Sequence, residues 1–134
     1  MSIEQLNSSY REGGWTIRQV VHHTADCYIN YYIRIKFALT EDTPIIKHFK
    51  QELWAELTDA KTLAVEISLE LIESLNMRLL TLTRSLSPDE LNRKFSHPVT
   101  GYFTIIKAIG FNVWHSYHHL AHILNYRKSI GFEG

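Results

Sequence analysis

Cysteine, net charge and long apolar runs are all scarce in this sequence of 134 residues. Cys27 is the only cysteine, so no disulfide can form within the chain, and we expect a cytoplasmic protein. Lysine plus arginine and aspartate plus glutamate each number 14, without a basic stripe, which argues against nucleic-acid binding. The apolar runs are too short for a membrane span or a signal peptide. Proline and glycine are too few for a disordered chain, and the length predicts one domain over residues 1–134.

Apolar periodicity predicts an all-α chain with three long helices. We expect them over about residues 16–39, 61–85 and 104–129. The capping box Thr16-Ile17-Arg18-Gln19 marks the start of the first helix, and Gly131 lies just beyond the end of the last. Shorter helices are expected near residues 49–57 and 88–94, the latter opened by Ser87-Pro88-Asp89-Glu90. Residues 1–15 should be irregular, and residues 95–103 a turn-rich loop or small hairpin. Long helices with short connections indicate an up-down helical bundle.

Six of the eight histidines lie in two clusters, His22-His23 near the start and four between residues 115 and 122. Imidazole is the commonest metal ligand in proteins, and two imidazoles four residues apart share one face of a helix. His115 and His119 flank the apolar arc that we expect to face the core, whereas His118 and His122 lie further round. That arc comprises Ile105, Ile109, Val113, Leu120, Ile123 and Leu124. We therefore predict that His115 and His119 bind a metal; the alternative is a solvated or hydrogen-bonded histidine face.

A third ligand is expected from the first long helix. His23, Asn30 and Arg34 fall within a narrow polar arc, whereas His22 shares its face with isoleucines. This pattern favours His23 as the ligand. Arg34 either holds an anionic substrate group or forms a surface ion pair.

Two neighbours of His23 have alternative roles. Asp26 either orients an imidazole through a hydrogen bond or is an exposed helical carboxylate. Cys27, one turn from His23, either reaches the metal or is a small buried side chain. The candidate catalytic residues are thus Asp26, Asn30 and Arg34.

The residues between the two histidines of the last helix bear on the chemistry. They are Ser116, Tyr117 and His118, so the glutamate that serves zinc proteases as general base is absent. A metal can still lower the pKa of bound water or ionise a bound thiol, which allows hydrolysis or thiol transfer. Tyr117 and Tyr126 either line a pocket or pack. His48 and His97 lie in connecting segments and are not expected to be ligands.

Two segments carry a family resemblance, Arg11-Glu12-Gly13-Gly14-Trp15-Thr16-Ile17-Arg18-Gln19-Val20-Val21-His22-His23 and Trp114 to Ile123. They resemble the DinB/YfiT-like superfamily of metal-dependent hydrolases, most closely its bacillithiol S-transferase branch, as does the stretch from Tyr32 to Pro44. The resemblance implies a helical bundle that holds nickel or zinc through His23, His115 and His119. It also implies conjugation of a small thiol to an electrophilic small molecule, and a homodimer.

The same resemblance implies a further long helix before the Gly-Gly-Trp segment, where this sequence has about a dozen residues. We expect either a truncated chain or a partner subunit that covers the exposed groove, and hence a homodimer or higher homo-oligomer. Leaving an apolar face of helix size exposed to water would cost several kcal/mol of folding free energy, and it would favour association.

Two functional hypotheses follow. The first is a cytoplasmic metal-dependent enzyme, a thiol S-transferase or hydrolase, in which a metal-bound thiolate or hydroxide attacks an electrophile held near Asn30 and Arg34. The second is a non-catalytic metal-binding module that senses or stores metal, or a degenerate enzyme. Three imidazoles suit zinc, nickel, copper or iron, so the ligand set alone does not choose among these metals.

Overall fold

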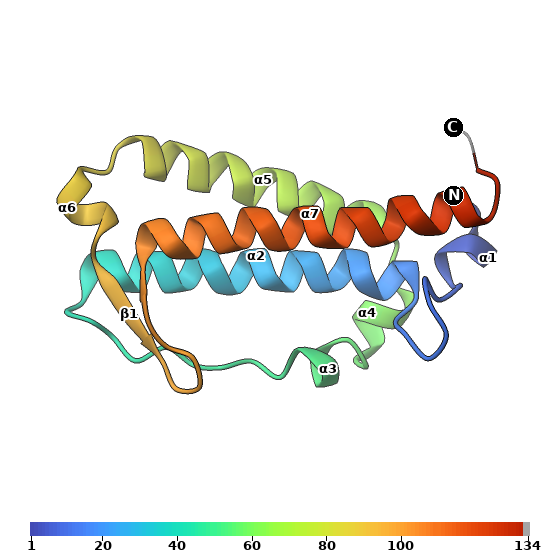
Figure 1. Cartoon of the computed structure of the whole chain (residues 1–134), viewed down its shortest axis with the longest axis horizontal. Coiled ribbons are helices and arrows are strands. Elements are labelled where there is room, and N and C mark those ends of the chain that lie inside the picture. The colour runs from blue at the N-terminus through green and yellow to red at the C-terminus, as the bar shows by residue number, and fades with distance from the viewer. Residues whose placement is uncertain (133–134) are drawn as a thin grey trace.

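The computed structural model describes residues 1–132; residues 133–134 of the expected domain lie outside the described residues. Three long helices, α2 (Ile17–Thr40), α5 (Val65–Arg84) and α7 (Ile105–Ser129), dominate the chain. Both α5 and α7 pack along α2 (Figure 1). The shorter elements are α1 (Ile3–Leu6), α3 (Gln51–Trp54), α4 (Thr58–Thr62), α6 (Pro88–Leu91), β1 (Lys94–His97) and β2 (Gly101–Thr104). Within residues 1–132, no helix has the length and apolar character needed to cross a membrane.

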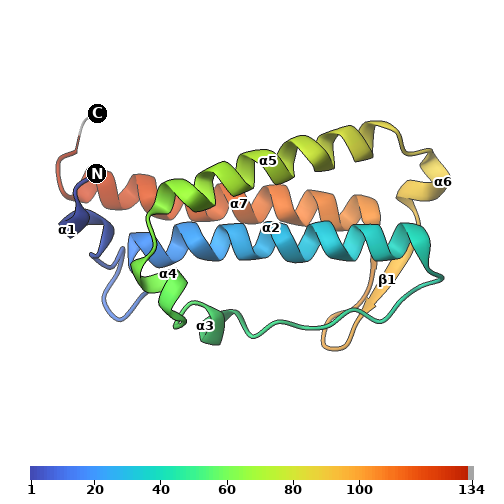
Figure 2. The same cartoon turned by 180° about the vertical axis from the view of Figure 1, so that it is seen from behind.

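The directions of the long helices differ from simple alternation. His22 contacts Ser68 near the start of both α2 and α5, and Arg78 lies over the ring of Tyr32 further along both helices. These two helices are therefore parallel, and α7 runs antiparallel to them (Figures 1 and 2). The expected helical bundle is confirmed, but its up-down alternation is not, because residues 41–64 carry the chain back along the bundle before α5 begins.

The predicted helix ends are largely confirmed by their caps. The Thr16 hydroxyl accepts from the Gln19 backbone N–H at 3.1 Å, and the Gln19 amide oxygen accepts from the Thr16 N–H at 3.0 Å. Ser87 and Glu90 form the same reciprocal pair at the start of α6. Gly131 follows α7 with a φ of +67°, a left-handed conformation that favours glycine.

The start of the second long helix was predicted wrongly. Residues 58–62 form the separate helix α4, and α5 begins only at Val65. The carbonyl of Leu63 accepts hydrogen bonds from Arg18 Nη1 at 2.6 Å and His22 Nε2 at 3.0 Å, so it is turned toward α2. Tertiary hydrogen bonds to this carbonyl explain the break, which apolar periodicity does not reveal.

Three other predicted boundaries are corrected. The region near residues 49–57 contains α3 and the approach to α4 instead of one helix. The helix expected near residues 88–94 ends at Leu91, because the chain enters β1 at Lys94. The segment expected to be irregular contains α1, which has its own capping box between Ser2 and Gln5.

Residues 94–104 form the hairpin allowed for by the sequence, in which Phe95 pairs with Phe103. The hairpin also binds the long connection, since the Ser96 N–H donates to the Pro44 carbonyl at 2.8 Å and the Ile46 N–H to the Ser96 carbonyl at 2.9 Å. Hairpin and connection are thereby held together near the end of α2. They form two of the walls of the cavity described below.

Only part of the predicted apolar arc of α7 is buried: Ile105 lies in the core and Ile109 packs against it, but the rest of the buried side differs from the predicted one. Asn112 and His119 are buried, whereas Val113, Leu120 and Leu124 of the expected apolar arc are 49%, 46% and 42% exposed. Apolar residues lie on more than one side of α7, and hydropathy did not indicate which side faces α2. The histidine side therefore lies closer to the bundle axis than the sequence predicted.

The central position of α2 predicts a contrast between two isoleucines of that helix. Ile35 is 1% exposed and Ile33 is 44% exposed. Ile35→Ala should lower the free energy of unfolding by about 2–5 kcal/mol, because it leaves a cavity in the core. The control Ile33→Ala should cost about 0.5 kcal/mol or less. Urea unfolding measures both, and equal losses would contradict the described packing.

Candidate metal centre

Three imidazoles from two antiparallel helices meet near the middle of the bundle. His23 Nε2 of α2 lies 3.4 Å from His115 Nε2 of α7, and His115 Nε2 lies 3.0 Å from His119 Nε2. The rings of His23 and His119 are 4.8 Å apart between centroids. The structure thus brings together the three histidines that the sequence singled out, across a separation of more than ninety residues.

These separations suit a shared cation. Two nitrogens that each lie about 2.0–2.1 Å from a tetrahedral zinc ion are separated by about 3.3 Å. The two Nε2 separations bracket this value. Three imidazoles would leave at least one coordination position open, which is typical of catalytic sites and not of structural ones.

The Gly-Gly-Trp segment before α2 covers one side of this cluster. Gly13 has a φ of +68°, so the chain turns there in a conformation that suits glycine. The turn brings the Trp15 ring to 4.7 Å from the His23 ring. His23 is only 2% exposed as a result of this cover and of packing against α7.

Hydrogen bonds explain why His23, and not His22, belongs to the cluster. His22 Nδ1 lies 2.7 Å from Ser68 Oγ, and its Nε2 lies 3.0 Å from the Leu63 carbonyl. Because a carbonyl only accepts, Nε2 donates and Nδ1 accepts from the serine hydroxyl. Both ring nitrogens of His22 are therefore engaged in joining α2 to the start of α5.

His118 and His122 lie on another side of α7. His118 stacks on Trp114 with ring centroids 5.1 Å apart, and His122 stacks on Tyr10 at 4.5 Å. Both rings contact the His119 ring, at 5.7 and 5.5 Å between centroids, but no hydrogen bond in the described part of the chain joins either of them to the three clustered imidazoles. This placement agrees with the prediction that they lie further round the helix.

Cys27 is closer to the cluster than the sequence could establish. Its Sγ lies 3.5 Å from His23 Nε2, and a ligand atom from each of His23, Cys27 and His115 fits within 4.8 Å. Burial raises the pKa of the Cys27 thiol to about 12, with a smaller contribution from Asp26. Arg34 acts in the opposite direction but does not outweigh burial, so without a bound metal this thiol stays protonated at neutral pH.

Burial also keeps the clustered imidazoles neutral. It lowers the pKa of His23 to about 4, helped by His115 and opposed by Glu52. Burial, followed by the neighbouring histidines, lowers the pKa of His119 to about 3, and burial lowers that of His115. Neutral imidazoles have the free lone pairs that metal binding needs, so the cluster is ready for a cation at neutral pH.

The carboxylate expected beside the cluster does not contact it. Burial, and then Asp59, raise the pKa of Asp26 to about 6, but no hydrogen bond in residues 1–132 joins its side chain to an imidazole. The Asn30 amide donates to the Asp26 carbonyl at 2.8 Å. The Nδ1 atoms of His115 and His119 are buried without a hydrogen-bond partner among the described residues. The orienting contact predicted for Asp26 is therefore not found.

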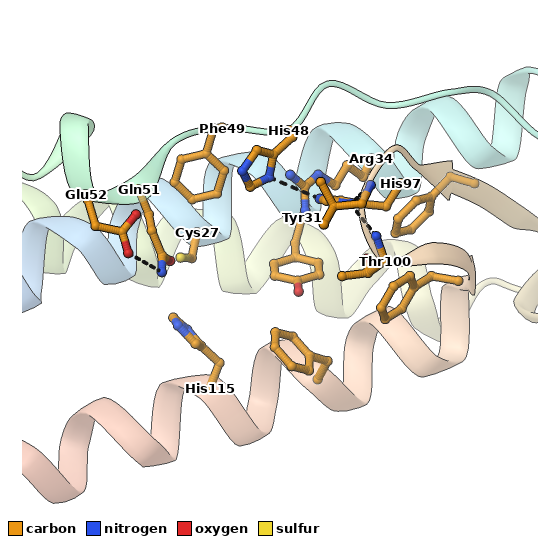
Figure 3. Close-up of a pocket in the computed structure, with 14 residues that line it drawn as sticks. Cys27, Tyr31, Arg34, His48, Phe49, Gln51, Glu52, His97, Thr100 and His115 are labelled. Atoms are coloured by element: carbon orange, nitrogen blue, oxygen red, sulfur yellow. Dashed lines mark hydrogen bonds between the residues drawn. The ribbon is translucent and has the colours of Figure 1, made fainter.

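A cavity of about 540 Å³ borders the cluster at His115 (Figure 3). It lies among α2, α7, the hairpin and the long connection. Arg34 lines it, whereas Asp26, Asn30, Tyr117 and Tyr126 do not. The other lining residues are Cys27, Tyr31, His48, Phe49, Gln51, Glu52, Phe95, His97, Val99, Thr100, Phe103, Phe111 and His115.

Two of these lining residues, His48 and His97, lie in connecting segments and were not expected at the site. His48 Nδ1 lies 3.3 Å from His97 Nε2. They meet because the long connection pairs with β1 at Ile45 and Ser96. Neither segment has a helical pattern or a motif that signals this pairing.

These features define a helical-bundle protein with a candidate three-histidine metal centre beside a cavity. The DinB superfamily matches residues 1–123 of the sequence. The chain belongs to this superfamily.

Relatives and a solved structure agree with this membership. A relative from Oceanobacillus iheyensis is 53% identical over 125 residues, 93% of this chain and 72% of the relative. A relative from Bacillus cereus is 50% identical over 129 residues, 96% of this chain and 74% of the relative. Both have provisional names as metal-dependent hydrolases. The solved structure of YfiT from Bacillus subtilis matches this chain with a TM-score of 0.97 and 45% sequence identity. The match covers 99% of this chain and 77% of the YfiT chain. YfiT is described as a probable metal-dependent hydrolase with an unusual four-helix bundle topology.

The lowered histidine pKa values predict how the stability of the metal-free protein depends on pH. Unfolded histidines bind protons below the ordinary value of 6.5, whereas folded His23 and His119 do so only near 4 and 3. The unfolded state therefore binds more protons in this window, and the free energy of unfolding should fall as the pH drops from about 6.5 to about 4.

Urea unfolding at several pH values, with chelator present, measures this dependence. The double variant His23→Gln/His119→Gln should flatten the decline, whereas His48→Gln, a change at an exposed histidine, should leave it as in the wild type. An identical slope in the double variant and the wild type would contradict the buried, neutral state of the cluster.

Proposed function

We propose that this protein is a metal-dependent enzyme in which His23, His115 and His119 hold a divalent metal that activates a small thiol or water against an electrophilic small molecule. The observation that carries the proposal is the convergence of three neutral Nε2 atoms beside a cavity. The relatives' names, which describe metal-dependent hydrolases, support it. When bound, the metal supplies Lewis acidity that lowers the pKa of a coordinated water or thiol.

The protein's own residues would set the geometry of this reaction. His115 borders both the cluster and the cavity, so the nucleophile would face a substrate held in the cavity. The rings of Tyr31 and Phe111, 5.9 Å apart, form an apolar wall beside it. Apolar walls reduce the access of water and strengthen electrostatic interactions at the reacting atoms.

Thiol transfer is the reaction we favour, because it needs the fewest auxiliary groups. A thiol ionised by the metal would need no separate carboxylate base, and no hydrogen bond among the described residues joins the Asp26 carboxyl group to the cluster. Hydrolysis is the second candidate, and one observation favours it: Glu52 lines the cavity and lies near enough to raise the pKa of His23. A carboxylate in that place could accept a proton from attacking water.

Zinc or nickel is the proposed metal, since imidazole nitrogens suit both. The proposed site of action is the cytoplasm. A buried thiol such as Cys27, beside a metal, persists in the reduced form that this compartment maintains.

We also propose that the protein acts as a homodimer or higher homo-oligomer. Val113, Leu120 and Leu124 recur on one exposed side of α7, away from its histidines. The exposed apolar residues of α5 are Ile67, Leu69, Leu71, Met77 and Leu80. Apolar surface of this extent favours association, and a second copy is the partner we propose for it.

Metal content tests the ligand assignment. The triple variant His23→Ala/His115→Ala/His119→Ala should purify without metal, whereas the wild type should bind about one equivalent of zinc or nickel, because three imidazoles account for the protein ligands of a catalytic site. The double variant His118→Ala/His122→Ala is the matched control on α7 and should keep the metal. A triple variant that retains stoichiometric metal would overturn the assignment.

The same preparations test turnover. Conjugation of a cysteine-type thiol to an alkyl halide should rise with metal occupancy in the wild type and the control, and should be absent in the triple variant. Glu52→Gln should impair ester hydrolysis far more than thiol conjugation if both reactions occur. Tight metal binding without any turnover would favour a module that senses or stores metal.

Sedimentation measures the proposed assembly. The wild type should sediment as a dimer or larger species, and Leu120→Glu/Leu124→Glu should shift it toward monomer, because charges on an apolar interface are costly to bury. Val99→Glu, on the exposed hairpin turn, is the control and should not change the distribution. A wild-type protein that sediments as a single monomeric species would contradict the proposal.

A further inference from the structure

The Arg34 side chain occupies one end of the cavity, away from the histidine cluster (Figure 3). It is only 8% exposed. Its Nη2 donates to the Lys47 carbonyl at 3.3 Å, and its guanidinium carbon lies 5.6 Å and 5.9 Å from the ring centroids of Tyr31 and Phe49. No ion pair joins it to a carboxylate within residues 1–132.

This arrangement is unusual for a buried charge. Removing a guanidinium from water is costly unless an anion and several hydrogen bonds compensate for the lost hydration. Arg34 has five N–H donors, and the Lys47 carbonyl accepts from only one of its nitrogens, in a long contact. The remaining donors belong to a group that lines a cavity large enough for a small molecule.

The neighbouring histidines, His48 and His97, cannot supply the anion that Arg34 lacks, because an imidazole is either neutral or cationic. His97 Nδ1 accepts from the backbone N–H groups of Val99 and Thr100, each at 3.1 Å, so its proton is on Nε2. That proton points to His48 Nδ1, 3.3 Å away. Burial, then the charge of Arg34, lower the pKa of His97, which keeps the His97 ring neutral.

Charge also limits which anion fits. Arg34 is the only lysine or arginine among the residues that line the cavity. The one lining carboxylate, Glu52, lies toward the opposite end with Cys27 and His115 (Figure 3). A singly charged carboxylate would therefore be neutralised by Arg34, and its planar shape matches the guanidinium fork. A phosphate dianion would keep an unpaired charge.

We propose that Arg34 binds the carboxylate of a small molecule whose apolar body lies along the aromatic walls of the cavity toward His115. The ligand class is thus an aromatic or other apolar monocarboxylate. Only the statement that this molecule is the electrophilic substrate rests on the proposed function. In that case the electrophilic carbon lies at the end of the molecule opposite the carboxylate, where Phe111 contacts both Tyr31 and His115.

Calorimetric titration with two matched probes tests the proposal. Phenylacetate and phenylacetamide share their apolar body, and only the first is charged. Phenylacetate should bind the full-length protein at least about tenfold more tightly, the range expected for charge-assisted hydrogen bonds. The preference should be the same before and after metal removal, because it arises at Arg34 and not at the histidines.

Variants locate the preference. Arg34→Met should abolish it while phenylacetamide still binds, which shows that the cavity remains folded, and Arg34→Lys should keep part of it. Arg78→Met changes another arginine that lies over an aromatic ring, that of Tyr32 outside this cavity, and should behave as the wild type.

Four results would overturn the proposal: equal binding of the two probes, a preference that survives in Arg34→Met, a preference that requires metal, or tighter binding of phenyl phosphate than of phenylacetate. Failure of the proposed enzyme activity would leave the binding result in metal-free protein intact. Conversely, a negative binding result would leave metal content and turnover unaffected, so the two failures are distinguishable.

Discussion

The packing of the histidine side of α7 against α2 is the contact on which the rest of the structure depends. It buries His23 and His119, whose neutral rings gain few hydrogen bonds in return, since the Nδ1 atoms of His115 and His119 have no partner among the described residues. Buried polar groups without partners lower stability, so the histidine cluster by itself weakens a contact that apolar residues such as Ile35, Ile105 and Ala108 otherwise stabilise. A cation shared by the three Nε2 atoms would offset that cost and add binding free energy to folding. A metal at the α2–α7 contact would therefore serve the proposed function and also stabilise the fold.

The other elements serve this contact by position. Trp15 covers His23 from the N-terminal side, and His22 ties α2 to α5 so that the neighbouring His23 faces α7. At the other end, Arg93 donates to the carbonyls of Ala38 and Glu41 at 2.7 and 2.9 Å, which holds the hairpin against the end of α2. The cavity between these anchors has an end at the histidine cluster, the proposed metal site, and a cationic end at Arg34. Such polarity suits a reaction that must orient a small substrate as well as activate a nucleophile.

Local signals in the sequence were sufficient to predict the helix caps and the pair of histidines on the last helix. The capping boxes at Thr16 and Ser87 depend on residues three apart, and the spacing of His115 and His119 depends on one turn of helix, so both could be predicted. The structure also places His23, and not His22, beside His115, and the reason, the engagement of both His22 nitrogens, is tertiary. What could not be predicted arises from pairings between distant segments. The helix is interrupted near Leu63 because the Leu63 carbonyl accepts a hydrogen bond from Arg18. His48 and His97 meet because residues 41–50 pair with β1. The side of α7 that is buried depends on the elements packed around it.

The central claim is that one divalent metal is bound by imidazoles from both α2 and α7. Anomalous diffraction from crystals of zinc- or nickel-loaded protein, collected on both sides of the metal absorption edge, tests it most directly. The account predicts a single strong peak at about 2.0–2.1 Å from the Nε2 atoms of His23, His115 and His119. A peak at His118 and His122, at His48 and His97, or nowhere in the bundle would contradict it.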